Sequence, residues 1–215
     1  MEKLSVIDAL KKLREQKKNF SQSFDLIVNL RDVNLKNPDE QLDVFLTLSK
    51  GTGKKLKIAA LVGPELQERA KGVVDLVIPQ TEFDKYKDKK LSKKLAQEYD
   101  YFIAQADIMP KIATVFGRTF GPKGKMPNPK LGSVLPGKAQ VEPIYKRLQN
   151  TVRAQAKKSP NVQVKVGTEE MKDADLIENI NYVYNQVVAN LPKEKSNVKR
   201  VLLKKTMSAP VELDL

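Results

Sequence analysis

The pattern of apolar residues changes twice along this chain of 215 residues, and that change constrains its fold more than any other feature. Near the start, apolar and polar residues alternate over Phe24–Leu30 and Val44–Leu48. In the middle, Leu56–Val62, Val73–Ile78 and Tyr101–Ala106 are almost continuous apolar runs. Alternation predicts strands with one solvated face, whereas short apolar runs separated by helices predict a parallel sheet covered on both faces.

The alternating pattern returns toward the end of the chain. Val162–Val166 alternates with polar residues, and Val198–Lys205 and Val211–Leu215 are predicted as the last strands. Because the two ends share one pattern and each is too short to bury a core alone, we predict that they form one α+β domain. This gives a discontinuous first domain, residues 1–62 and 154–215, and an inserted α/β domain, residues 63–153. Three small units in series are the competing arrangement.

Helical spacing predicts the helices between these strands. The first, Leu4–Leu13, includes Ile7 on its apolar face, and the strongest, Leu176–Leu191, stops at Pro192. The stretch 32–40 is expected to be a loop. Further helices are expected over 65–71, 91–99, 108–116 and from about 143 to 157, with Ile144, Leu148 and Val152 on the apolar face of the last.

The charge and the missing residue types restrict the function. Lys and Arg number 39 against 26 Asp and Glu, a formal net charge of +13, which favours an anionic partner such as nucleic acid over a merely solvated basic surface. The chain has no cysteine and no histidine, so it lacks a disulfide, a thiolate nucleophile and the commonest general base and metal ligands. From these missing residue types we expect a protein that is not an enzyme and uses no metal or cofactor. Because the chain has no membrane-length apolar stretch and no signal peptide over Met1–Leu13, we expect it to be cytoplasmic.

A basic loop, Phe120–Gly132, is the most unusual local segment. Its prolines and glycines are expected to hold it off any helix or strand, and no Asp or Glu occurs from Lys111 to Lys138. Stiff turns combined with positive charge are typical of a segment that offers backbone and charge to an anion.

Two glycine-rich segments are candidate phosphate cradles. Gly132–Lys138 has the spacing of a nucleotide-binding P-loop, but Ala139 replaces the required Ser or Thr and Pro136 removes an N–H from the cradle. A nucleotide-dependent enzyme is therefore the weaker alternative. Gly51–Lys54 is either a plain turn leaving a strand or a basic knuckle beside a phosphate backbone.

Two polar turns are further candidates for a nucleic-acid surface. Asn19–Ser23 places Phe20 beside small hydroxyl and amide side chains, a mixture suited to RNA if the ring is exposed and to a simple turn if it packs inward. Lys204–Pro210 is either a hairpin-like connection or an RNA-facing turn.

These segments together give the whole chain a resemblance to the large-subunit ribosomal protein L-one family, and its length and ends resemble the archaeal branch. The resemblance rests on the run Phe120–Lys130, which is similar to the family signature, and on the turns around Phe20, Ser49–Lys54 and Thr206-Met207. The signature-loop residues are Gly121, Pro122, Lys123, Gly124, Lys125, Met126, Pro127, Asn128, Pro129 and Lys130.

The resemblance implies a Rossmann-like inserted domain and an RNA-binding surface on the first domain. Partners implied in the same way are large-subunit rRNA at the mobile lateral stalk, tRNA leaving the ribosome in its deacylated form, the protein's own mRNA leader, which it would repress, and other ribosomal components, with a monomer when free. The implied RNA-binding residues are Phe20, Ser21, Gln22, Ser23, Lys54, Lys204, Thr206, Met207 and Ser208. Ser208 is a departure, because the family usually has glycine after Thr-Met. A general nucleic-acid-binding protein is the alternative function.

Overall fold

The computed structural model describes residues 4–16 and 18–214, so Met1–Lys3, Lys17 and the end of the last predicted strand, Leu215, lie outside the described residues. The chain divides into two compact units. The first combines both ends, Met1–Lys54 and Asn150–Leu215, and the second is the inserted segment Lys55–Gln149. The predicted α/β class is confirmed, since helices accompany both antiparallel and parallel sheets.

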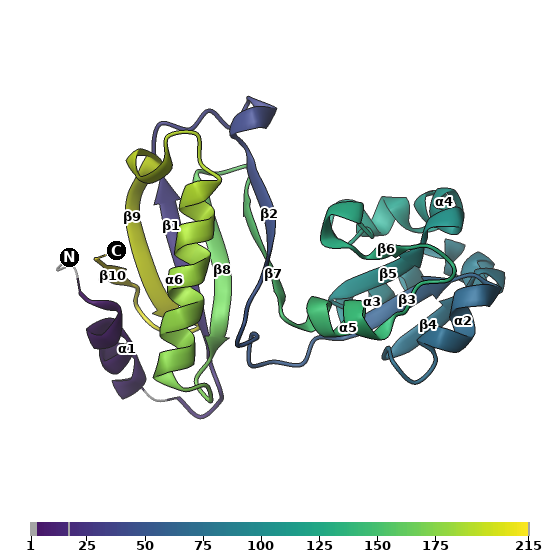
Figure 1. Ribbon diagram of the computed structural model, residues 1–215, viewed down its shortest axis with the longest axis horizontal. Helices are drawn as coiled ribbons and strands as arrows, with labels where there is room; N and C mark the ends of the chain where they lie inside the picture. Colours follow the sequence, from purple (N-terminus) through teal and green to yellow (C-terminus); the bar gives the residue numbers. More distant parts are fainter. Residues whose placement is uncertain (1–3, 17, 215) are drawn as a thin grey trace. The chain divides into compact units, whose positions relative to one another are not determined.

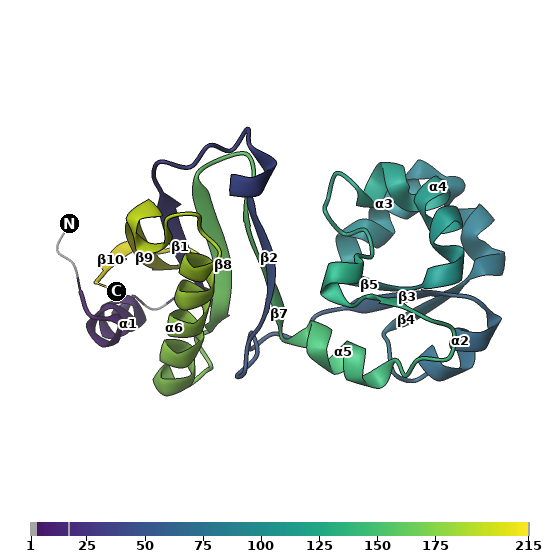
Figure 2. The same cartoon turned by 45° about the horizontal axis from the view of Figure 1, so that its top comes forward.

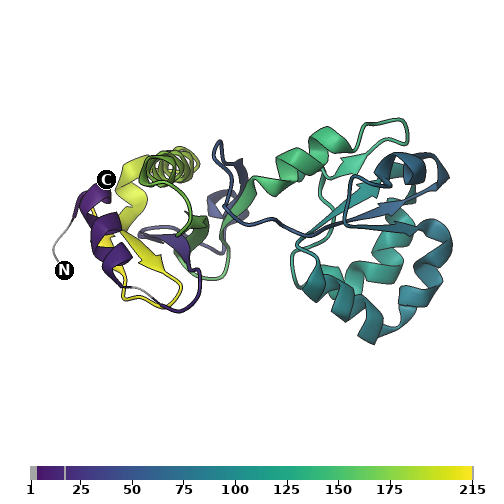
Figure 3. The same ribbon diagram turned by 90° about the horizontal axis from the view of Figure 1, so that it is seen from below.

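The first unit is built on an antiparallel sheet of four strands in the order β10-β9-β1-β8. Alternation in β1 buries Phe24, Leu26, Val28 and Leu30 against the helices, as the sequence predicts. Figures 1 and 3 show helix α6 lying along one face of this sheet. The strands and helices are β1 (Ser23–Leu30), β8 (Asn161–Thr168), β9 (Val198–Lys205), β10 (Val211–Leu213), α1 (Val6–Glu15) and α6 (Asp173–Ala189).

Helix α1 begins at Val6, two residues after the predicted start, because Leu4 instead forms a β-bridge with Leu213 of β10. Ser5 is its N-cap, because its hydroxyl accepts a hydrogen bond from the backbone N–H of Asp8. Leu10 and Leu13 are buried, but Ile7, predicted for the same face, is 54% exposed. The face of α1 that packs against the core is therefore narrower than the spacing of its apolar residues predicts.

The predicted helix from about 143 to 157 is wrong in its second half. Helix α5 (Glu142–Gln149) ends at Gln149, and Thr151–Ala156 forms strand β7, which pairs antiparallel with β2 (Leu42–Thr47). Arg153 of β7 forks onto Asp43 of β2, with Nε–Oδ1 at 2.7 Å and Nη2–Oδ2 at 2.9 Å. The β-branched pair Thr151-Val152 and these cross-strand contacts favour the strand.

The predicted domain boundaries also move. The structure places them after Lys54 and after Gln149, so residues 55–62 belong to the inserted unit and residues 150–153 to the first. The physical reason is strand pairing. Ile58–Val62, strand β3, hydrogen-bonds in parallel to two strands of the inserted unit, while Thr151–Ala156 pairs with β2 of the first.

The inserted unit is a parallel sheet in the order β4-β3-β5-β6 with helices on both faces. Figure 2 shows α3 and α4 on one face of the sheet and α2 on the other. The elements are β3 (Ile58–Val62), β4 (Leu76–Pro79), β5 (Tyr101–Gln105), β6 (Val134–Leu135), α2 (Pro64–Ala70), α3 (Lys89–Glu98), α4 (Met109–Phe120) and α5. Short 3-10 turns occur in both units: η1 (Pro38–Glu40), η2 (Gln80–Lys87), η3 (Ala106–Ile108), η4 (Pro129–Leu131) and η5 (Glu194–Asn197).

An aromatic cluster forms the core between this sheet and helix α4. Phe120, expected to open the basic loop, is instead the last residue of α4 and is fully buried. Its ring stacks on Phe102 of β5 at a centroid distance of 4.2 Å and contacts Phe116 at 5.0 Å. The loop thus starts from a residue that the core fixes in place.

We predict that Phe102→Ala destabilises the protein by about 3–5 kcal/mol, because a large ring is deleted from a fully buried stack. The measurement is chemical denaturation at neutral pH. Leu91→Ala is the matched control, since Leu91 lies in the same unit but is exposed, and it should cost well under 1 kcal/mol. Equal losses in the two variants would contradict the assignment of this cluster as the core.

Candidate nucleic-acid interface

Two turns that are far apart in sequence meet at one end of the first unit's sheet. Because β1 and β9 are antiparallel neighbours, the start of β1 lies beside the end of β9 (Figure 1). The backbone N–H of Thr206 donates to Ser23 O at 3.1 Å, and Ser23 N–H donates to Thr206 Oγ1 at 3.2 Å. The structure thus brings together most of the predicted RNA-binding residues. We call Phe20, Ser21, Ser23, Thr206 and Met207 the turn face.

The turn face exposes two large apolar side chains. Phe20 is 51% exposed and Met207 is 67% exposed. The inward-packed alternative for Phe20 is therefore wrong. Single exposed apolar residues are ordinary, but two in adjacent turns beside exposed Ser21 and Thr206 form a mixed surface suited to contact with a partner.

Gln22 lies beneath the turn face and not on it. It was predicted to contact RNA, yet it is only 1% exposed. Its Oε1 accepts a hydrogen bond from the backbone N–H of Met207 at 3.0 Å, and its carbonyl accepts from Glu169 N–H at 3.0 Å. The Gln22 side chain is therefore a brace that fixes Met207, because a buried amide must satisfy its polar atoms inside the protein.

Ser208 closes the second turn. Its Oγ accepts from Lys205 N–H at 2.7 Å, and its own N–H donates to Lys205 O at 3.2 Å. Among the described residues other than glycine, positive φ occurs at Asp32 and Glu194 only. The backbone at Ser208 therefore needs no glycine, and the departure from the family pattern causes no strain there.

A buried ion pair holds the two turns in place. Lys205 is 0% exposed, and its Nζ lies 2.6 Å from Glu169 Oε1 and 2.5 Å from Gln16 O. The other carboxylate oxygen, Glu169 Oε2, accepts from Gln22 N–H at 2.9 Å. Arg14 of α1 adds a hydrogen bond to Glu169 O at 2.8 Å. This pair is not among the predicted site residues, although strand alternation places Lys205 inward, opposite buried Phe24.

The environment of Glu169 keeps it ionised. Burial raises the pKa of the Glu169 carboxyl, but hydrogen bonds from Lys205 and from Gln22 N–H, with the charges of Lys205 and Arg14, outweigh that effect and leave the pKa below its usual value.

Charged residues extend the turn face along the sheet. Asp25 of β1 lies between Lys204 of β9 and Lys165 of β8 in the strand register. Burial raises the pKa of Asp25, while the charges of Lys204 and Lys165 and a hydrogen bond from Gln163 oppose it. Lys204 was predicted for this surface, and Lys165 was missed although its outward position follows from the alternation in β8.

The Gly51–Lys54 turn lies at the same end of the sheet. Gly53 has φ +69°, and a Cβ there would lie 2.3 Å from Oγ1 of Thr168, the β8 residue paired with Ser23. The geometry is that of a glycine turn leaving a strand, which leaves Lys54 exposed. The plain-turn reading is confirmed, and a contact of Lys54 with a phosphate backbone stays a prediction.

The basic loop belongs to the inserted unit and serves it structurally. Lys125 Nζ donates to Tyr99 O at 2.6 Å, and Lys123 Nζ donates to Lys93 O at 3.4 Å. Burial lowers the pKa of Lys125, with Lys123 nearby, although Asp100 opposes this. Pro127 is buried, and Asn128 Oδ1 caps the turn at Lys130 N–H at 2.9 Å. The other loop residues are half-buried Met126 and exposed Gly121, Pro122, Gly124, Pro129 and Lys130.

The inserted unit does not offer a nucleotide site where such sheets usually have one, outside the carboxyl ends of its central strands. There the N–H of Gly63 is taken by Gln105 Oε1 at 2.9 Å. A Cβ on Gly137 would lie 2.3 Å from Glu65 Oε2, so a carboxylate fills the space that a phosphate would need. The P-loop-like run Gly132–Lys138 contains strand β6 and precedes no helix directly, so the P-loop alternative fails.

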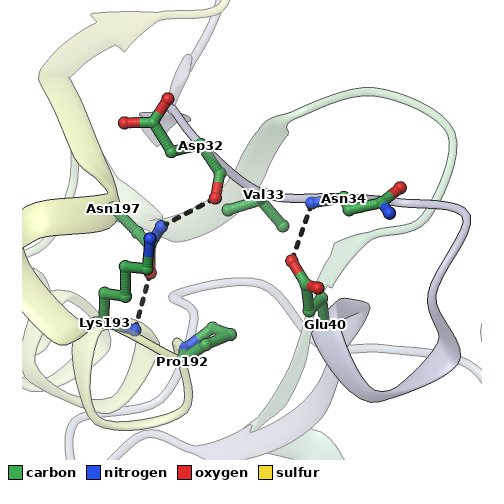
Figure 4. A pocket seen from close by; sticks show the side chains of 7 residues that line it. All are labelled: Asp32, Val33, Asn34, Glu40, Pro192, Lys193 and Asn197. Atoms are coloured by element: carbon green, nitrogen blue, oxygen red, sulfur yellow. Dashed lines mark hydrogen bonds between the residues drawn. The ribbon is translucent and has the colours of Figure 1, made fainter.

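A hollow of about 570 Å³ lies elsewhere in the first unit, and Figure 4 shows the residues that line it. Its polar groups are used internally: Asn197 Nδ2 donates to Asp32 O at 3.2 Å, and Glu40 Oε2 accepts from Asn34 N–H at 2.8 Å. The carboxylate of Asp32 points away from Glu40 (Figure 4). No convergent chemistry results, and within residues 4–16 and 18–214 no group of acidic residues could hold a metal ion. No helix in this described part is long and apolar enough to span a membrane.

Comparison with known proteins confirms the resemblance. The model of the ribosomal protein L1p/L10e family matches residues 10–209. "Large ribosomal subunit protein uL1" of Nanoarchaeum equitans is 41% identical over 212 residues, covering 96% of this chain and 98% of that protein. The proteins of the same name from Methanobrevibacter smithii and Methanothermococcus thermolithotrophicus are 39% and 37% identical, with 97% and 100% of this chain covered and 98% and 100% of theirs. All three organisms are archaea, in agreement with the branch that the sequence resembles.

We predict that Lys205→Met destabilises the protein by about 2–3 kcal/mol near pH 7, because it removes charge-assisted hydrogen bonds to Glu169 and to Gln16 O. Combining it with Glu169→Gln should recover part of the loss. Because the folded pKa of Glu169 lies below its unfolded value of 4.5, the contribution is full above pH 4.5 and fades as pH falls through the folded value. Denaturation from pH 7 to pH 3 should show the wild-type advantage shrinking; a constant gap would argue against the ion pair.

Proposed function

We propose that this chain, which belongs to the ribosomal protein L1p/L10e family, binds large-subunit rRNA through the turn face of its first unit. The chain is a structural constituent of the large ribosomal subunit and not an enzyme. The observation that supports the RNA-binding proposal most is the pairing of exposed Phe20 and Met207 in two turns locked by a buried ion pair.

The chemistry of the turn face suits an RNA surface. An exposed ring and a thioether can contact the faces or edges of unstacked bases, and the hydroxyls of Ser21 and Thr206 can hydrogen-bond to 2′-OH groups and phosphates. Lys204 and Lys54 would supply charge to neighbouring phosphates. In this proposal affinity comes largely from charge, and selectivity from RNA shape and 2′-OH contacts.

The bracing contacts suit tight recognition as well. Gln22 and Glu169 fix the backbone of both turns before any ligand arrives. A preorganised surface spends less free energy on ordering side chains when it binds. We therefore expect the turn face to bind RNA with little change in backbone conformation.

The finer roles are proposals that rest on the family resemblance. In them the protein resides in the cytoplasm, is a monomer when free, and on the ribosome works beside other ribosomal components. At the mobile lateral stalk it would help deacylated tRNA to leave, and it would repress translation of its own mRNA when the leader copies the rRNA fold. Because both RNAs would use the turn face, a leader transcript should compete with rRNA for the free protein. A general nucleic-acid binder, the alternative, would instead bind unrelated duplexes with an affinity equal to that for rRNA.

We predict that Thr206→Ala and Met207→Ala each weaken binding to large-subunit rRNA by about tenfold or more, the equivalent of roughly 1.4 kcal/mol or greater. The cause is loss of a hydroxyl contact in one variant and of apolar contact in the other. Gel-shift titration measures the affinity, and a thermal melt beside it checks that both variants stay folded.

Two matched controls sharpen this test. Ile7→Ala removes an apolar side chain that is 54% exposed on the same unit but outside the turn face, and it should bind like wild type. Thr206→Ser keeps the hydroxyl and should retain most of the affinity. Wild-type binding by Thr206→Ala and Met207→Ala would remove the turn face as the RNA site.

We also predict that the first unit alone binds this RNA. A shortened chain that joins Lys54 to Asn150 through a few glycines keeps β2 paired with β7, and Leu48 N–H still donates to Asn150 O at 2.9 Å just before the junction. Filter binding should give an affinity for the rRNA fragment within about tenfold of the full chain. Deleting residues 63–153 instead should unfold the unit, since that removes half of β7 and leaves β3 without its partner strands. A folded 54–150 fusion that fails to bind would show that the inserted unit is essential.

A further inference from the structure

A cluster of exposed lysines covers one side of helix α3 in the inserted unit. At about 100° per residue, the four lysines of this helix fall within an arc of roughly 140°. The opposite side carries the buried residues Ser92, Leu95 and Ala96. Lys123 of the basic loop joins them, since its Nζ lies 3.4 Å from Lys93 O. We call the five residues the lysine face: Lys89, Lys90, Lys93, Lys94 and Lys123.

The lysine face has little acidic compensation. Residues 85–97 contain six lysines and one acid, Asp88, whose Oδ1 caps α3 by accepting from Lys90 N–H at 2.9 Å. The neighbouring Lys85 and Lys87 pair with Glu82 and Asp84, at 3.5 Å and 2.6 Å. Within residues 4–16 and 18–214, no lysine of the lysine face makes an ion pair with a carboxylate.

This arrangement opposes the stability of the free protein. Lys89 and Lys93, and Lys90 and Lys94, are like charges at i and i+4, and lysines in the first turn also oppose the helix dipole. The same imbalance holds for the whole inserted unit, residues 55–149, which has 18 Lys and Arg against 10 Asp and Glu. A bound polyanion would relieve this repulsion, and the charge pattern is complementary to one.

We propose that the lysine face binds the phosphate backbone of a double-stranded segment of ribosomal RNA, as a second contact distinct from the turn face. Ribosomal RNA is the polyanion that the proposed function assigns to this protein, so the identity of the partner rests on that proposed function. Among the exposed large apolar side chains of the described residues, Leu91 is the one on α3, so this surface offers no aromatic ring for stacking. It therefore contacts backbone charge and not base identity.

The size of the surface matches such a contact. Helix α3 has 10 residues and is about 15 Å long. A duplex carries one phosphate charge per roughly 1.7 Å of axis, hence about nine over that length, enough for five ammonium groups. Lysines act as flexible point charges, which suits sequence-independent contact better than the forked recognition of a single group by arginine.

The test compares salt dependence in full-length variants. Lys89→Gln, Lys90→Gln, Lys93→Gln and Lys94→Gln combined keep helix propensity and remove four charges. The matched control substitutes Gln at four ion-paired lysines of the same unit: Lys55, Lys57, Lys85 and Lys146. Binding to a 20-base-pair RNA duplex of arbitrary sequence, to large-subunit rRNA and to transfer RNA is measured by filter retention over a range of salt.

For the duplex and the rRNA, the plot of the logarithm of the binding constant against the logarithm of the salt concentration should become shallower in the lysine-face variant. The magnitude of its negative slope should fall by about 2–4, since each lost phosphate contact removes roughly 0.9. The control variant should change that slope by less than 1. Thermal melts should show the lysine-face variant at least as stable as wild type. Thr206→Ala should leave duplex binding unchanged, which separates this surface from the turn face.

Equal slopes for wild type and the lysine-face variant would overturn the proposal. So would equal losses in the lysine-face and control variants, because net charge alone would then account for binding. A loss confined to transfer RNA would overturn ribosomal RNA as the partner. If Thr206→Ala does not weaken rRNA binding, the proposed function of the turn face is contradicted. The comparison of the lysine-face variant with its control variant still tests the lysine face in that case.

Discussion

The contact between Lys205 and Glu169 is the interaction on which the turn face depends. Four segments meet there: the end of α1 through Gln16 O, the approach to β1 through Gln22 N–H, the loop after β8, and the end of β9. A buried ion pair often contributes little net stability, because removing both charges from water offsets their attraction. Its effect here is to fix geometry. Because the ammonium and the carboxylate are both satisfied in this arrangement, the two turns that expose Phe20 and Met207 are held together.

The two units use different physical means to present their surfaces. The first unit presents a small number of apolar and hydroxyl groups on a braced backbone, which favours selectivity. The inserted unit presents exposed lysines on helix α3, and Lys123 and Lys125 hold the adjoining loop against that helix and its C-cap. Contacts to phosphate position a protein on RNA and contacts to bases and 2′-OH groups discriminate, so the two surfaces can divide these tasks between them.

Much of this fold follows from hydrophobic periodicity. The alternation in β1, β8 and β9 and the apolar runs of β3 and β5 predict both sheet types and the insertion of one pattern within the other. The failure at 143–157 has a clear cause. Val152 follows Leu148 at helical spacing, but it also alternates with Ala154 and Ala156, and only pairing with β2 decides between the two periods. The misplaced second domain boundary follows from that ambiguity.

The meeting of the two turns follows from the family resemblance, whereas the burial of individual side chains does not. Phe20, Ser21, Thr206 and Met207 were assigned through family resemblance, and the structure brings them together. Gln22 was assigned to the surface because nothing in a short polar turn tells which side chain points inward. Lys205 and Glu169 are not predicted from the sequence because a lysine side chain is normally solvated. Strand alternation predicts that Lys205 points inward, but its charge predicts that it is exposed. Long-range pairing with a residue 36 positions away is visible only in the fold.

Hydroxyl-radical footprinting of the protein, free and saturated with large-subunit rRNA, tests the central claim most directly. Met207 and Phe20 are reactive side chains that are 67% and 51% exposed, so both should be oxidised readily in the free protein. Ile7, at 54%, and Tyr182, at 38%, are exposed on the same unit and serve as internal references. The account predicts that bound RNA strongly protects Met207 and Phe20 and leaves Ile7 and Tyr182 unchanged. Undiminished oxidation of Met207 and Phe20 in the saturated complex would contradict it.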